Sequence, residues 1–307
     1  MRIGIHTSIA GSLEKAALKA AELGANTFQI FSSSPRMWRP SVPAKSDIVA
    51  LRRARERLDL RPLAIHVNYL INLASLDPVV REKSIAAFRG EIERAEAIGA
   101  EYLVTHPGSY RGQAIEQALA AFVLGLAEAA GRSRTSGVTV LLENTAGGGA
   151  QIGCRLEELH CIRDLASRET DLRIGYCLDT CHLLAAGFDI ASQAGLNKTV
   201  AEVGRILGLE NVKLIHANDS KMPLGSHVDR HANIGEGHIG SAGFRRILAH
   251  PDLRPKPFIL ETPRDTDGDD RRNVEKLKSL APGQPKRTPT RRDKPGSRSG
   301  ASRSSAS

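Results

Sequence analysis

Residues 138–143 read Val-Thr-Val-Leu-Leu-Glu, a short apolar run that ends in a carboxylate. Valine and threonine favour extended backbone, and a nearly continuous apolar run of this length is typical of a strand covered on both faces of a parallel sheet. Seven other short runs along the chain have the same character. They occupy residues 3–6, 27–31, 63–67, 102–106, 174–179, 212–217 and 258–261.

The spacing of these eight runs predicts the fold. Successive runs start 24 to 46 residues apart, which suits one strand plus one crossover helix for each interval. Helical patterns occupy residues 12–23, 79–98, 114–130, 155–167, 199–207 and 241–249, and Ser12 and Gly24 bracket the first of them. Eight strands alternating with helices predict an α/β protein, a single (β/α)₈ TIM barrel over residues 1–280. A doubly wound open sheet is the alternative, although it usually has fewer strands.

Composition narrows the class of protein. The chain has 307 residues, of which 41% are hydrophobic and 25% charged, as in ordinary globular proteins. No run approaches the about 18 apolar residues of a membrane helix, and the first residues lack the pattern of a signal peptide. We therefore expect a cytoplasmic protein with no membrane partner. The four cysteines form no CxxC pair and are expected to be reduced thiols.

The net charge of +9 is distributed unevenly. Residues 281–307 contain seven Lys and Arg against one Asp, among many Pro, Ser and Gly residues. Such a composition buries almost nothing and predicts a disordered basic tail after the barrel domain. The tail either attracts DNA phosphates without sequence preference or is simply solvated. The body of the chain is only mildly basic.

Histidine and carboxylate side chains recur where the predicted strands end. His6, His66, His106, Glu143, Asp179, His216 and Glu261 lie at or beside the ends of seven runs. These residue types are poor strand formers and are costly to bury unpaired. The carboxyl ends of barrel strands form the face that carries the active site in TIM-barrel enzymes. The pattern therefore predicts a polar site at this face.

Two further pairs extend the set of candidate metal ligands. His182 lies three residues after Asp179, and Asp229 and His231 are two residues apart, so that an extended backbone directs both to one side. The nine candidates are His66, His106, Glu143, Asp179, His182, His216, Asp229, His231 and Glu261. One tetrahedral zinc ion takes only four ligands, so nine suit two or three ions. Imidazoles with carboxylates favour Zn²⁺, allow Mn²⁺ or Fe²⁺ and disfavour Mg²⁺. Clustered metals indicate a phosphodiesterase that works by in-line displacement at phosphorus.

Longer motifs around these residues resemble the endonuclease IV family of metal-dependent apurinic/apyrimidinic (AP) endonucleases. The resemblance covers residues 3 to about 280. The motifs are HVNYLINL at 66–73, HPGS at 106–109, LENTAG at 142–147, LDTCH at 178–182, HANDSK at 216–221, VDRH at 228–231, IGEGHIG at 234–240 and ILET at 259–262.

The resemblance implies a monomeric DNA-repair enzyme that holds three zinc ions, with Mn²⁺ as a possible substitute. Glu143 would bridge two ions, His66 and His106 would complete one site, and Asp179, His216 and Glu261 the second. His182, Asp229 and His231 would hold the third. A metal-bound hydroxide would cut duplex DNA 5′ to an abasic site, leaving a 3′-hydroxyl and a 5′-deoxyribose phosphate, and the enzyme would also clear 3′-blocked nicks. Glu143 and Glu261 are the expected catalytic residues, and the bound enzyme would lie at the nucleoid.

The same resemblance assigns the DNA contacts. Arg36, Tyr69 and Leu70 match loop residues that enter the duplex at the lesion and help to flip out the abasic nucleotide. An aromatic or apolar wedge replaces lost stacking, and extrusion costs least where no base pair exists.

Two rival functions remain open from the sequence. A xylose-isomerase-like sugar isomerase or epimerase shares this barrel type but needs only one or two ions, which leaves His182, Asp229 and His231 unexplained. A non-catalytic nucleic-acid binder fits the basic tail but leaves nine candidate ligands without a purpose.

Overall fold

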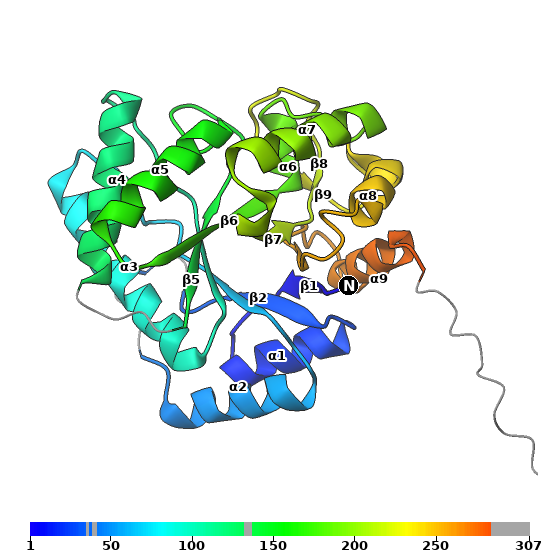
Figure 1. The fold of residues 1–307 in the computed structure, drawn as a ribbon. Coiled ribbons are helices and arrows are strands. Elements are labelled where there is room, and N and C mark those ends of the chain that lie inside the picture. Colours follow the sequence, from blue (N-terminus) through cyan, green and yellow to red (C-terminus); the bar gives the residue numbers. More distant parts are fainter. Residues whose placement is uncertain (35–36, 39–41, 132–136, 284–307) are drawn as a thin grey trace, which may run out of the picture.

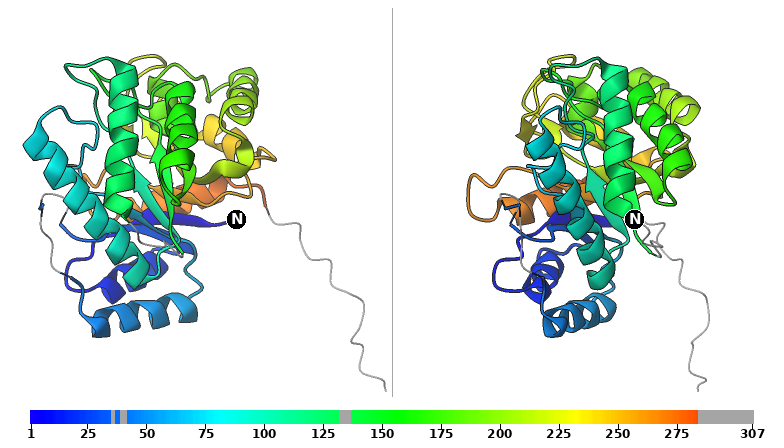
Figure 2. Two further views of the ribbon diagram at one scale, coloured as in Figure 1. Left: turned by 60° about the vertical axis from the view of Figure 1, so that its left-hand side comes forward. Right: turned by 90° about the vertical axis from the view of Figure 1, so that its left-hand side faces the viewer.

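A computed structural model describes residues 1–34, 37–38, 42–131 and 137–283. Eight parallel strands close into a barrel in which each strand lies beside its neighbours in chain order, and helices surround it (Figures 1 and 2). The strands are β1 (Ile3–His6), β2 (Thr27–Phe31), β3 (Leu63–His66), β4 (Tyr102–Thr105), β5 (Thr139–Glu143), β6 (Arg173–Asp179), β7 (Val212–His216) and β10 (Phe258–Leu260). The predicted TIM barrel is confirmed, and each strand ends within one residue of its expected limits.

The helices follow the strands around the outside of the barrel. They are α1 (Leu13–Glu22), α2 (Lys45–Arg57), α3 (Pro78–Ile98), α4 (Ile115–Ala130), α5 (Leu156–Glu169), α6 (Thr180–Ala185), α7 (Gln193–Ile206), α8 (Gly240–Ala249) and α9 (Asp269–Leu280), with a 3₁₀ turn at Leu209–Asn211. None of the helices in the described part of the chain is long and apolar enough to cross a membrane. The predicted tail begins after α9, and from residue 284 onward it lies outside the described residues.

Capping explains why some helices were expected and others were not. Ser12 accepts a hydrogen bond from the backbone N–H of Lys15 at the start of α1, as its position predicts. By contrast, α2 begins after Ala44, which provides no side-chain cap, so the sequence carries no start signal there. Helix α7 begins at Gln193, earlier than predicted, because Ser192 caps it by accepting from the N–H of Gly195.

Two apolar layers hold the barrel together. The larger layer lies between the strands and the helices. A smaller one fills the barrel itself and consists of Ala64, Val104, Leu141, Cys177, Leu214 and Ile259, all fully buried, with Tyr102 packed against them. Because this inner layer closes the barrel below, polar groups at the carboxyl ends of the strands face an open cavity above it.

A short two-stranded sheet lies beyond the barrel and was not predicted. It pairs β8 (Asp219–Ser220) with β9 (His231–Ala232) in antiparallel fashion, with Ser220 opposite His231. This pairing returns residues 229–231 toward the end of β7. Strands of two residues carry no periodicity, so no sequence pattern could have revealed them.

Candidate metal centre

The structure brings the nine candidate ligands together at the carboxyl end of the barrel. His66, Glu143, Asp179 and His216 are the last residues of β3, β5, β6 and β7, while His106 and Glu261 directly follow β4 and β10. Their ligand atoms form overlapping groups within which all atoms lie no more than 4.8 Å apart. Three of the four groups among the described residues contain only predicted ligands: His66, His106 and Glu143; Glu143, Asp179, His216 and Glu261; and His182, Asp229 and His231.

Local structure delivers His182 to this cluster. Asp179 ends β6 and also caps α6, because its Oδ1 accepts a 2.9 Å hydrogen bond from the backbone N–H of His182. The strand therefore turns directly into a helix whose first turn carries the imidazole. In the same way, the β8–β9 pairing fixes His231, and with it the neighbouring Asp229, above β7.

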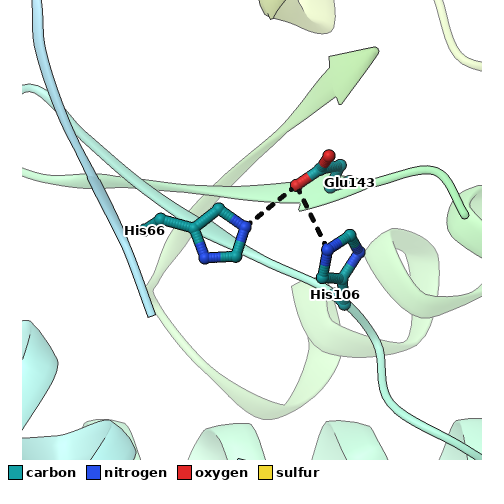
Figure 3. Close-up of side chains that lie close together, drawn as sticks. All are labelled: His66, His106 and Glu143. Carbon is teal, nitrogen blue, oxygen red and sulfur yellow. Dashed lines mark hydrogen bonds and ion pairs between the residues drawn. The ribbon is translucent and has the colours of Figure 1, made fainter. Parts of the chain in front are cut away.

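Glu143 lies at the centre of the cluster and is completely buried. Its Oε2 is 3.2 Å from Nε2 of His66 and 3.6 Å from Nε2 of His106, and both rings point to this one oxygen (Figure 3). Its Oε1 is 3.0 Å from Nδ1 of His216 and 3.5 Å from Nδ1 of His182. One carboxylate thus faces four imidazoles, a position suited to bridging two cations.

Three histidines are fixed in a common orientation. The Nδ1 atoms of His66, His182 and His231 lie 2.8, 2.9 and 2.9 Å from backbone carbonyl oxygens. A carbonyl oxygen only accepts, so Nδ1 donates in each case and the lone pair of the neutral ring is on Nε2. Each of these Nε2 atoms faces carboxylate oxygen, of Glu143 for His66 and of Asp229 for the other two. Histidines that bind metals are usually oriented in this way.

Gln29 orients a fourth histidine, His216, with the roles of its two ring nitrogens exchanged. Its amide N–H donates to Oε1 of Glu261 at 2.5 Å, so its carbonyl oxygen faces Nε2 of His216 at 2.8 Å. Nε2 of His216 must then carry the hydrogen, and Nδ1 carries the lone pair of the neutral ring. That atom lies 3.0 Å from Glu143 and 3.2 Å from Glu261. Gln29 was missed in the sequence, although a single amide in an otherwise apolar strand was a usable signal.

The electrostatics of the cluster favour positive charge. Burial opposes ionisation of His182, but Asp179, Asp229 and Glu143 outweigh it and raise the pKa of this imidazole to about 10. Burial likewise opposes charge on His231, yet Asp229 and Asp179 raise its pKa to about 9. The pKa of Glu143 is held well below its usual range by the surrounding histidines despite its burial. A divalent cation can replace the protons that these imidazoles take up and can balance the surrounding carboxylates, so the residues fit a metal centre.

Other residues support the cluster without joining it. Asn218 donates to Oδ2 of Asp179 at 2.6 Å and accepts from the backbone N–H of Glu261, and Asn144 accepts from the N–H of Asp179. Asp219 accepts from backbone N–H groups of Gly235, Gly237, Ile239 and Gly240 and so orders the loop after β9. These roles depend on contacts between distant segments and carry no local sequence signal.

Cys181 approaches the cluster through Asp179 and His231. Burial raises the pKa of its thiol to about 12, so the thiolate form that binds metals is disfavoured. All four cysteines are free, in agreement with the expected thiols.

The expected DNA contacts are only partly described. Arg36 lies outside the described residues. Tyr69 is 70% exposed, lines the cavity above the barrel, and its ring centre lies 5.3 Å from that of Phe31 in an edge-on contact. Leu70 is half-buried beside it and donates its backbone N–H to the side chain of Asn68.

The chain is similar in sequence and structure to known TIM-barrel proteins. A family model of xylose isomerase-like TIM barrels matches residues 17–281. A protein of Solibacter usitatus named "Probable endonuclease 4" is 65% identical over 92% of this chain and 97% of its own length. One of the same name from Halothermothrix orenii is 42% identical over 86% and 94%. The crystal structure of endonuclease IV from Thermus thermophilus superposes with a TM-score of 0.79 at 39% identity, covering 91% of this chain and 98% of that one.

The chain therefore belongs to the endonuclease IV family, as its motifs predicted, and it is a metal-dependent hydrolytic nuclease of DNA repair. Sugar epimerases also share its architecture. A D-tagatose 3-epimerase-like protein superposes with a TM-score of 0.66 at 21% identity. Similarity at that level concerns the fold alone.

Proposed function

We propose that this enzyme hydrolyses duplex DNA on the 5′ side of abasic sites, leaving a 3′-hydroxyl and a 5′-deoxyribose phosphate. We propose further that it removes groups that block 3′ ends at nicks and acts as a monomer in the cytoplasm, at the nucleoid. The observation that carries the proposal is the fixed orientation of four histidines, each of which turns a ring nitrogen toward carboxylate oxygen at the carboxyl end of the barrel.

The three groups of ligand atoms support three zinc ions per chain. His66, His106 and Glu143 would hold the first, Glu143, Asp179, His216 and Glu261 the second, and His182, Asp229 and His231 the third. The mixture of imidazoles and carboxylates favours zinc, with manganese as a substitute. When bound, zinc supplies the Lewis acidity that activates water near neutral pH and the positive charge that stabilises a phosphate under attack.

The two carboxylates proposed as catalytic differ in access to substrate. The side chain of Glu261 is 20% exposed and lines the cavity, so it can accept a hydrogen bond from the attacking water and orient it toward phosphorus. Glu143 is buried beneath the imidazoles and cannot reach DNA, so its part would be to hold metal together with them. Loss of either carboxylate should stop incision, by different routes.

Recognition of the lesion would come from the rim of the cavity. The exposed ring of Tyr69 stands beside the cluster and is suited to fill the gap in the base stack, with Leu70 next to it. Arg36, which lies outside the described residues, is the third proposed contact with DNA.

A duplex with one tetrahydrofuran abasic analogue tests the proposed function. This analogue cannot undergo β-elimination, so a cut must be hydrolytic. We expect incision immediately 5′ to the analogue, with a 3′ end that a DNA polymerase extends and no incision of the undamaged duplex. Equal cutting of both duplexes would contradict lesion specificity. Absence of any cut by protein that carries its metals would refute the proposal and favour a sugar epimerase, to be tested with ketoses.

A further inference from the structure

A buried ion pair joins the end of β2 to α3 and takes no part in the metal cluster. Glu91 and Arg94 lie three residues apart on α3 and are only 1% and 7% exposed, with Nη2 of Arg94 3.1 Å from Oε1 of Glu91. Ser32, the first residue after β2, is also buried and contacts both. Its hydroxyl donates to Oε2 of Glu91 and accepts from Nε of Arg94 at 2.7 Å. We call these three residues the Ser32 cluster.

Stability alone does not explain why this ion pair is buried. Removing two charges from water is unfavourable, and their attraction often fails to recover the loss, so apolar side chains of similar volume usually stabilise a core as well. Burial raises the pKa of Glu91 against the effects of Arg94 and Ser32, so the carboxylate depends on these partners to remain charged. The helix also contains Gly90, unfavourable in a helix interior, where a Cβ would lie 2.9 Å from Nη1 of Arg94. These features indicate that the cluster serves geometry rather than stability.

The residue before Ser32 lies among three other rings beside the metal cluster. Phe31 is the last residue of β2 and lies opposite His66 in the parallel register of β2 and β3. The centre of its ring is 5.3 Å from that of Tyr69 and 5.8 Å from that of His66, both in edge-on contacts. It is also 4.5 Å from the ring centre of His6. Phe31 therefore provides a surface on which Tyr69 packs next to a predicted metal ligand.

The residues after Ser32 form a second link to the segment that carries Tyr69. Met37 donates its backbone N–H to the carbonyl of Ser34, and its own carbonyl accepts from the side-chain amide of Asn68 at 3.4 Å. Asn68 directly precedes Tyr69. The segment after β2 thus contacts the segment after β3 both before and after Ser32 in the chain, and Ser32 is the point at which the buried ion pair holds it.

We propose that the Ser32 cluster fixes the segment after β2 so that Phe31 holds the ring of Tyr69 in place to enter the base stack at an abasic site. The proposal rests on the proposed function, because it presumes that Tyr69 enters damaged DNA. Ser32, Glu91 and Arg94 are positioning residues, since none of them is among the residues that line the cavity above the barrel.

A double-substitution cycle with Tyr69 tests this route. Ser32→Ala removes the hydroxyl that joins the segment to the ion pair and leaves the pair itself in place. The KM for the abasic duplex should rise about 5- to 100-fold, the range for loss of one stacked base, with little change in kcat, in bound metal or in the Ki of an undamaged competitor duplex. In a Tyr69→Ala background the same change should add nothing, because the stacking is already lost. An unchanged KM for Ser32→Ala, or additive losses in the double variant, would overturn the proposal.

Two controls separate positioning from a general loss of packing. Ser32→Thr keeps the hydroxyl and should retain the KM of wild type. Thr27→Val removes a buried hydroxyl at the opposite end of the same strand, where it donates to the carbonyl of Pro62. This variant should unfold at a lower temperature without a rise in KM. An equal rise in KM for Thr27→Val would show that any damage to β2 has this effect, which contradicts a specific role of Ser32.

Replacement of the whole ion pair distinguishes geometry from stability. Glu91→Leu combined with Arg94→Met keeps similar volumes, so the unfolding temperature should be unchanged or raised. The hydroxyl of Ser32 then loses both of its charged partners, and the KM for the abasic duplex should rise as it does for Ser32→Ala. A stable double variant with the KM of wild type would show that the ion pair positions nothing and would refute the proposal.

A fluorescence measurement keeps this test apart from the proposed function. Trp38 is the only tryptophan of the chain, directly follows Met37 and packs half-buried against the core. Its emission in the full-length protein reports on the segment after β2 without any DNA. Ser32→Ala should make Trp38 more accessible to quenching by acrylamide, whereas Thr27→Val should not, and unchanged quenching in Ser32→Ala would contradict the proposal. Failure of wild type to incise the abasic duplex would refute the proposed function instead, and the quenching would still decide whether Ser32 holds the segment.

Discussion

Replacing Gln29 by leucine tests whether the orientation of His216 matters to the metal centre. Gln29 is fully buried on β2, and its amide bridges Nε2 of His216 and Oε1 of Glu261. Leucine has a similar volume but neither donates nor accepts. The change would leave the N–H of His216 buried without a partner, or would let the imidazole shift its hydrogen to Nδ1. In the second case the lone pair that faces Glu143 and Glu261 is lost.

The size of the effect follows from these contacts. A buried donor left unpaired costs about 1–3 kcal/mol. At 1.36 kcal/mol for each factor of ten, this corresponds to a loss of about 5- to 150-fold in affinity for the metal that His216 would hold. Residues that hydrogen-bond to metal-ligating histidines typically contribute about 10- to 100-fold to metal affinity, which is in the same range.

Metal affinity is the primary measurement for Gln29→Leu. Titration of the metal-free protein with zinc against a chromophoric chelator gives the affinity of each ion, and circular dichroism confirms folding. We expect one ion to bind about 10- to 100-fold more weakly and the others to change little. Gln193→Leu, an exposed glutamine on α7, is the control. A folded Gln29→Leu protein with all affinities within about twofold of wild type would refute the reasoning behind this orientation.

Three further predictions concern the centre of the cluster, the rim and the tail. Glu143→Gln keeps the shape of the side chain but removes the charge between four imidazoles, so it should abolish incision. Zinc affinity should fall by more than the about 10- to 100-fold expected when a residue that only orients a ligand is lost. Unchanged metal content and rate would exclude a bridge. Tyr69→Ala should weaken binding to the abasic duplex about 5- to 100-fold by loss of stacking and should affect binding to the undamaged duplex less. Tyr69→Phe keeps the ring and should retain affinity. Equal losses on both duplexes would argue against insertion of Tyr69 into the base stack. Deletion of residues 284–307 removes seven Lys and Arg but keeps Ala281, which packs on the core. The affinity for DNA should then depend less steeply on salt concentration, and the metal centre should be unaffected. An unaltered salt dependence would show that the tail has no part in binding.

The sequence predicted the barrel, and the candidate ligands that it singled out converge in the structure, for a physical reason. Parallel strands buried on both faces are apolar throughout, so a histidine or carboxylate at a strand end stands out. His106, Glu143 and Asp179 are recognisable for this reason. All such strand ends meet at one face of a closed barrel, and their convergence follows from the topology alone.

The sequence did not predict how the site is held in place. The bridge from Gln29 to His216 and Glu261 joins residues far apart in the chain, and nothing local to Gln29 indicates its partners. The orientation of each imidazole depends on which carbonyl lies behind it.

The most direct test of the account combines metal content with incision of the tetrahydrofuran duplex. Protein is stripped by prolonged chelation, and zinc is returned in measured equivalents while incision is followed at each step. The account predicts no incision by stripped protein and full recovery of cutting 5′ to the lesion only as the third equivalent binds. Full activity without metal, or at a single equivalent, would contradict a centre built from all nine residues.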